Sequence, residues 1–90
     1  MPGENNVSEN RNKIDEIDNQ ILELLNERAE ISLDIREIKK SLSVEIYDPA
    51  REEEVVDALC KKNGGPIDDE NIRKLFLKIM DIMRGLPDKN

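Results

Sequence analysis

The sequence contains no histidine and a single cysteine, Cys60. Without histidine, this chain has neither a Ser-His-Asp triad nor a Cys-His pair. One cysteine forms no disulfide within the chain and no Cys/His zinc site. Cys60 lies in a helical-looking run, residues 55–62, where a thiol usually packs as a small hydrophobe. We therefore expect no metal site and no cofactor.

Aromatic residues and long apolar runs are also scarce. The aromatic residues are Tyr47 and Phe76 alone, so we expect a core of Ile, Leu and Val. No stretch approaches the roughly 18 consecutive apolar residues of a membrane helix. Residues 1–10 lack the basic and apolar regions of a signal peptide. These features predict a cytoplasmic protein without a membrane partner.

Positive charge is in deficit, with 14 Lys and Arg against 21 Asp and Glu and a formal net charge of −7. That average repels nucleic acid, so no nucleic-acid partner is expected. The length of 90 residues fits one small domain, which buries only about 60–65% of its unfolded surface. We expect a single domain over 1–90.

Apolar residues recur at steps of three and four along the first half of the chain. They are Ile14, Ile17, Ile21, Leu24, Ile31, Ile35, Ile38 and Leu42. This spacing predicts one long amphipathic helix over about 8–41, capped by Ser8, after a disordered segment 1–7. A compact monomer of this size cannot bury so long a stripe, so two chains are expected to pack their long helices together.

Two shorter helices are predicted after the long one. Asp48 is a suitable N-cap and Pro49 a suitable first residue for a helix over 49–62. The sequence Asn-Gly-Gly-Pro at 63–66 ends it, and Asp68 or Asp69 caps a third helix over 68–86. No strand is predicted. The expected fold class is all-α, with three helices per chain in an intertwined helical homodimer.

Arg28 interrupts the apolar stripe of the long helix. A buried arginine is costly unless it is paired. Its partner is either a carboxylate, such as Glu52 or Glu27 of the partner subunit, or a ligand. Lys39 lies eleven residues further on, which returns it to within about 20° of the same face and about 16 Å along the axis. Two such cations suit a small dianion.

The second helix places Arg51 and Glu52 on the same face as Val55. Acidic and basic residues in a first turn are often only a solvated charge run. Together with Arg28 and Lys39, however, they form a pattern suited to a hydroxylated dicarboxylate. Arg11 lies about 25 Å from Arg28, too far to serve the same small ligand within one chain. It is either a solvated arginine in a first helical turn or, in an antiparallel dimer, a residue that serves the ligand of the other chain.

Three segments, taken in order, resemble a known family. They are RNKIDEIDNQILELLNERAEISLDIREIK at 11–39, YDPAREEEVVDAL at 47–59 and IRKLFLKIMDIMRGL at 72–86. Together they resemble the all-helical class of chorismate mutase, especially the mutase domain of chorismate mutase/prephenate dehydratase proteins. The resemblance covers about 8–86. It implies an isomerase of phenylalanine and tyrosine biosynthesis that rearranges chorismate to prephenate.

The resemblance also implies roles for individual residues. Arg28 and Arg51 would bind the substrate carboxylates, and Arg11 would enter from the other subunit. Lys39 would donate a hydrogen bond to the ether oxygen of the breaking bond and bind a carboxylate. Glu52 would hold the ring hydroxyl. Arg28, Lys39 and Glu52 are the expected catalytic residues, and Asp48 lies alongside them as a further substrate contact.

The third helix departs from the family pattern. The family usually carries a small polar residue there and, four positions later, a Gln or Glu that joins the lysine at the ether oxygen. The matching positions here are Met83 and Pro87, both expected to line the substrate site. Proline has no side-chain donor. Either Arg84, Lys89 or a shifted C-terminal segment replaces the missing group, or the lysine works without it.

A [3,3] rearrangement fits the composition because it needs neither a nucleophile nor a general base. Catalysis would consist of conformational restraint and electrostatic stabilisation. Two alternatives stay open from the sequence. One is isochorismate pyruvate lyase, which has the same fold and a similarly cationic pocket. The other is a weakly active regulatory helical module that partners another enzyme of the aromatic pathway.

Overall fold

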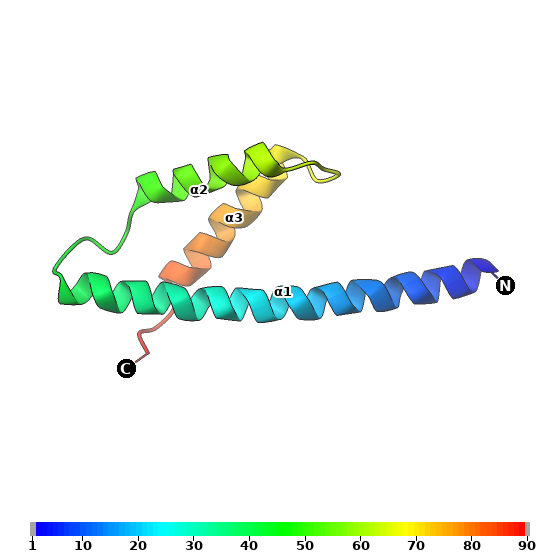
Figure 1. The fold of residues 1–90 in the computed structure, drawn as a ribbon, viewed down its shortest axis with the longest axis horizontal. Helices are drawn as coiled ribbons and strands as arrows, with labels where there is room; N and C mark the ends of the chain where they lie inside the picture. The colour runs from blue at the N-terminus through cyan, green and yellow to red at the C-terminus, as the bar shows by residue number, and fades with distance from the viewer. Residues whose placement is uncertain (1, 90) are drawn as a thin grey trace. The chain divides into compact units, whose positions relative to one another are not determined.

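A computed structural model describes residues 2–89. It contains three helices, α1 (Pro2–Ser41), α2 (Pro49–Lys62) and α3 (Asp69–Arg84), and no strand within that range (Figure 1). The predicted all-helical fold class is therefore confirmed. None of these helices combines the length and apolar character that spanning a membrane requires.

The chain divides into two compact units, Met1–Ser32 and Leu33–Asn90. The first unit is the N-terminal part of α1. The second contains the last residues of α1 together with α2 and α3. The single domain expected over 1–90 stays a prediction.

The start of α1 differs from the expected one. The helix begins at Pro2, so Ser8 lies inside it and is not its N-cap, and residues 2–7 are helical. Proline suits a first helical position because its missing N–H needs no partner there. No further proline interrupts the segment that follows. Residue 1, also expected to be disordered, lies outside the described residues. The predicted end of the helix at Ser41 is correct.

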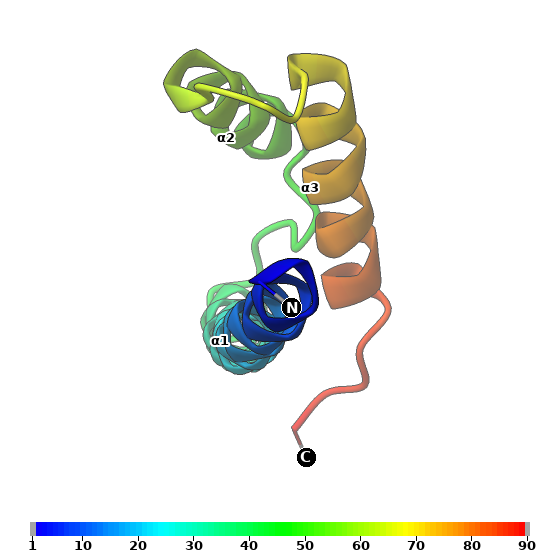
Figure 2. The ribbon, with the colours of Figure 1, turned by 90° about the vertical axis from the view of Figure 1, so that its right-hand side faces the viewer.

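In the second unit, α2 packs against α3, and Figure 2 shows the two helices side by side. The buried apolar residues are Val56, Met80 and Met83. This core differs from the Ile, Leu and Val core expected from the composition, because two of its three members are methionines. Methionine is flexible enough to fill irregular gaps between two helices that carry little aromatic bulk.

Both predicted caps of the shorter helices form. Asp48 Oδ1 accepts a hydrogen bond from the Arg51 backbone N–H at 3.0 Å. Asp68 Oδ1 does the same for the Asn71 backbone N–H at 3.2 Å, which decides between the two caps considered for α3. These bonds satisfy backbone donors that have no partner within the helix. The bounds of α2 are as predicted, whereas α3 is shorter than 68–86 because it ends at the Gly85 C-cap.

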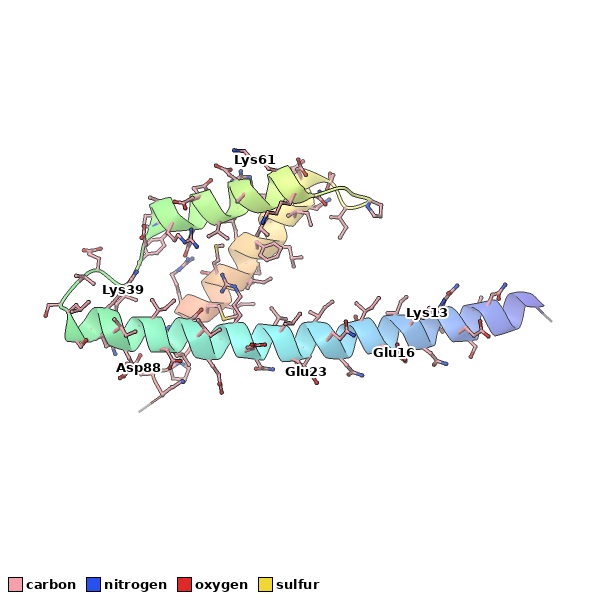
Figure 3. All side chains as sticks on the ribbon, in the orientation of Figure 1. Lys13, Glu16, Glu23, Lys39, Lys61 and Asp88 are labelled. Carbon is pink, nitrogen blue, oxygen red and sulfur yellow. The ribbon has the colours of Figure 1, made fainter. Side chains whose placement is uncertain are left out.

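The segment after α3 is held by the end of α1. Arg36, whose side chain is 12% exposed, donates hydrogen bonds to the carbonyls of Met83 at 2.8 Å and Leu86 at 2.6 Å. The carbonyls at a helix C-terminus lack partners within the helix and attract cations. Arg36 and Lys40 also form ion pairs with Asp88, which Figure 3 labels beside α1. We call Arg36, Lys40 and Asp88 the C-terminal clasp.

Candidate functional site

Lys39 lies in the last turn of α1, where the chain leads into the connection to α2 (Figure 3). Its side chain is half-buried, and its Nζ donates a hydrogen bond to the Ile46 carbonyl at 3.2 Å. No carboxylate of the described side chains pairs with it. The ammonium group is therefore held in place by a neutral acceptor, which leaves its charge uncompensated for an anionic ligand.

Glu52 lies in the first turn of α2, just after the Asp48 cap. Its side chain is 19% exposed, and Oε2 forms an ion pair with Nη1 of Arg84 from the end of α3. A carboxylate in the first turn is favoured by the positive end of the helix dipole. The helix terminus and Arg84 together stabilise a charged carboxylate at this position.

Arg84 has further contacts. Its Nη2 donates to Asp81 Oδ1 at 3.2 Å, and its guanidinium carbon lies 4.7 Å from the centre of the Tyr47 ring. That distance is within the range of a cation–π interaction. The pKa of the Arg84 guanidinium is raised above its ordinary value, chiefly by the hydrogen bond to Glu52.

The second unit thus brings together Lys39, the loop at Ile46 and Tyr47, and Glu52. Asp48 lies at the same end of α2. Arg51 is not part of this group. Its side chain is 64% exposed and forms an ion pair at 2.9 Å with Glu54, whose side chain is 71% exposed. In this single chain, Arg51 forms part of a solvated charge run, the alternative that the sequence left open.

The two predicted positions on the α3 side have different environments. Met83 is a core residue, 8% exposed, and Pro87 is exposed between the end of α3 and the clasp. Two side chains were considered as replacements for the missing Gln or Glu. Both form ion pairs in this structure. Arg84 pairs with Glu52, and Lys89 Nζ lies 2.8 Å from Asp34 Oδ1.

Arg11 and Arg28 belong to the first unit. Arg11 is exposed and Arg28 is half-buried. Within that unit, neither arginine makes an ion pair with a described side chain. Both guanidinium groups therefore have donors to offer a ligand or a partner chain.

Sequence reasoning missed Arg36 and undervalued Tyr47. Arg36 carries the C-terminal clasp, and the ring of Tyr47, to which the sequence analysis gave no role, lies under the Arg84 guanidinium group. One signal was present for Arg36. Asp88 is an acidic residue just beyond the end of the third helix, where it complements cations in the last turns of the first.

The chemistry available here is binding and electrostatic stabilisation. The second unit offers a lysine without an anionic partner among the described side chains and a mostly buried carboxylate. Cations held in fixed positions stabilise negative charge that develops on an oxygen atom. Such a set suits a small anion with a hydroxyl group.

Known proteins are similar to this chain in sequence and in fold. The model of the family "Chorismate mutase type II" matches residues 10–86. The chorismate mutase of Methanocaldococcus jannaschii is 44% identical over 84 residues, which are 89% of this chain and 82% of that protein. The bifunctional chorismate mutase/prephenate dehydratase of Neisseria gonorrhoeae is also 44% identical over 70 residues, but these span 78% of this chain and only 19% of that protein.

Two solved structures are also similar to this chain. Form II of the chorismate mutase from Thermus thermophilus superposes with a TM-score of 0.87 at 38% identity, covering 89% of this chain and 91% of that one. Form I gives a TM-score of 0.85. Since the family model covers most of the chain and the Methanocaldococcus relative is matched over most of its length, this chain belongs to the chorismate mutase type II family, a family of isomerases.

Proposed function

We propose that this chain rearranges chorismate to prephenate in the biosynthesis of phenylalanine and tyrosine, at a site shared between two copies of the chain. The observation that carries this proposal is the family match over residues 10–86, which spans Arg11, Arg28, Lys39, Arg51 and Glu52. The environment of Lys39 supports it, because this ammonium group has no carboxylate partner among the described side chains.

The proposed mechanism assigns a task to each charged group. Arg28 and Arg51 bind the two substrate carboxylates, joined by Arg11 of the partner subunit. Lys39 meets the negative charge that develops on the ether oxygen as its bond to carbon breaks. These contacts hold the enolpyruvyl arm over the ring, which supplies the proximity needed for a unimolecular rearrangement.

Glu52 accepts a hydrogen bond from the ring hydroxyl, with Asp48 beside it at the start of α2. Arg51 must turn away from Glu54 to reach a substrate. That movement costs little, because an exposed ion pair contributes about 0–1 kcal/mol. Met83 and Pro87 complete the set of proposed substrate-binding positions.

The functional unit is a homodimer. Many large apolar residues along α1 are 48–62% exposed in the single chain: Val7, Ile14, Ile17, Ile21, Leu22, Leu24, Ile31, Ile35 and Ile38. Fully burying one such side chain contributes about 1.5–3 kcal/mol. A second copy of α1 offers a complementary surface of the same length, so this stripe supports an intertwined pair of chains.

The remaining proposals concern partners and location. The partners are chorismate and a second copy of the chain, with no nucleic acid and no membrane. The net charge of −7 supports the first exclusion. The protein is cytoplasmic.

The direct test is product analysis with the purified chain. Incubation with chorismate is expected to give prephenate, and incubation with isochorismate is expected to release no pyruvate. The Lys39→Ala variant should lower kcat/KM by about 100-fold or more, as removal of one donor to a developing oxyanion does. Arg28→Ala should also lower kcat/KM, because a substrate carboxylate loses its cation. Pyruvate formed from isochorismate would indicate the lyase instead. A folded chain that converts neither substrate would favour the regulatory module.

A further inference from the structure

Arg84 joins three parts of the second unit. From the last residue of α3 it reaches Glu52 on α2, Asp81 on its own helix at 3.2 Å and the ring of Tyr47 in the loop before α2 at 4.7 Å. The proposed function gives it no task. Its contact with Glu52 nevertheless puts it next to a residue that is proposed to bind the substrate.

We propose that Arg84 is a positioning residue for Glu52. It holds the carboxylate in the orientation in which the second oxygen, Oε1, accepts the hydrogen bond of the substrate's ring hydroxyl. This inference rests on the proposed function, because the hydroxyl belongs to chorismate. It does not make Arg84 a catalytic residue, since Arg84 acts through Glu52.

The hydrogen bonds of Glu52 support this role. Arg84 occupies Oε2 alone, and no other described side chain donates to Glu52. One oxygen is therefore fixed while the other is available. A glutamate side chain has several rotatable bonds, and a planar guanidinium with directed donors restrains it better than a diffuse charge would.

Tyr47 fixes Arg84 in turn and connects it with the proposed catalytic lysine. The ring lies beneath the guanidinium group, and the preceding residue, Ile46, accepts the hydrogen bond from Lys39 at 3.2 Å. Two cations thus hold neighbouring residues of one short loop. Through this loop, Arg84 links the position of Glu52 to that of Lys39.

Arg73 provides a matched control on the same helix. It also ties α3 to α2 by ion pairs, with Glu53 at 2.8 Å and with Asp57. Its side chain is 36% exposed, against 35% for Arg84. None of the residues it contacts is a proposed site residue. The Arg73→Ala variant therefore shows how far the loss of ion pairs between α2 and α3 changes kcat/KM when no proposed site residue is involved.

The test is a double-mutant cycle in kcat/KM for chorismate, with variants Arg84→Ala, Glu52→Gln and both together. Arg84→Ala is expected to lower kcat/KM by about tenfold in the wild-type background and by less than about twofold when Glu52→Gln is present, because residues that act as one unit are not additive. Arg84→Lys, which keeps the charge, should regain part of the loss and replaces the alanine variant if that one does not fold. Arg73→Ala should leave kcat/KM within about twofold.

Several outcomes would overturn the inference. They are an unchanged kcat/KM in Arg84→Ala, an equal loss with and without Glu52→Gln, and a loss of the same size in Arg73→Ala. A wild-type chain that forms no prephenate contradicts the proposed function instead. In that case the unfolding free energies of the same three variants test the inference. If the effects of the two substitutions are coupled, Arg84 positions Glu52; if they are additive, the inference is refuted.

Discussion

At the scale of single residues, the charged groups fall into two kinds. Some already have ionic partners, such as Glu52 with Arg84, whereas others, such as Lys39, have a neutral partner only. A cation that already has a carboxylate must exchange it for a ligand, whereas an unpaired one gains an interaction outright. This difference agrees with the role that the family resemblance implies for Lys39 at the ether oxygen, and it leaves Arg84 a positioning role.

We expect Asp88 to make the stability of the folded chain depend on pH in the acid range. Its hydrogen bonds with Lys40 and Arg36 lower the pKa of this carboxyl below the ordinary value of 3.8. A lowered pKa in the folded state means that the stabilisation is complete above pH 3.8 and is lost as the pH falls through the folded-state value. Wild type should therefore exceed Asp88→Asn in unfolding free energy near pH 6, and the difference should shrink below pH 3.8.

Urea unfolding of both proteins between pH 6 and about 2.5 measures this difference. Comparing the two proteins isolates Asp88, because every other carboxyl group is shared by wild type and variant. A difference that stays constant over the whole range would show that the C-terminal clasp does not depend on the charge of Asp88.

At the scale of elements, much of the fold could be predicted because its signals are local. Asp48 with Pro49 marks the start of α2, and the helix begins there. The predicted start of α1 was wrong because Ser8 suits an N-cap, whereas Pro2 suits the first position of a helix that begins earlier in the chain. A preference at one residue does not decide between two permissible starts.

The environment of the site was less predictable than the helices. Spacing along a helix places Arg51 and Glu52 together, yet one pairs with exposed Glu54 and the other with Arg84 from another helix. Partners from distant parts of the chain depend on packing, which periodicity does not reveal. The same reason explains why Arg36 and its contacts with the end of α3 were missed.

The N-cap of α3 offers a test at this scale. Asp68→Ala removes the acceptor of the Asn71 N–H, so the unfolding free energy should fall by about 1 kcal/mol. Asp68→Asn keeps an acceptor and should stay close to wild type. Denaturant unfolding of both variants checks this prediction, and equal stability of the alanine and asparagine variants would contradict it.

At the scale of the whole molecule, the exposed apolar residues of α1 support the view that one chain is half of the functional unit. Residues such as Ile14, Ile17 and Ile21 are about half exposed in the single chain. Arg11 and Arg28 likewise have no ionic partner among the described side chains of their own unit. A second copy would bury the apolar stripe and bring Arg11 to the site of the other chain.

Subunit complementation tests this shared site most directly. In a mixed dimer of Arg11→Ala and Lys39→Ala chains, one site combines the intact Lys39 of the first chain with the intact Arg11 of the second, and the other site carries both defects. Each variant alone should form prephenate from chorismate slowly, while the mixture, after unfolding and refolding together, should regain up to about half the activity per mixed dimer. Light scattering checks whether each sample is a dimer. A mixture no more active than its components, with mixed dimers shown to form, would contradict the account.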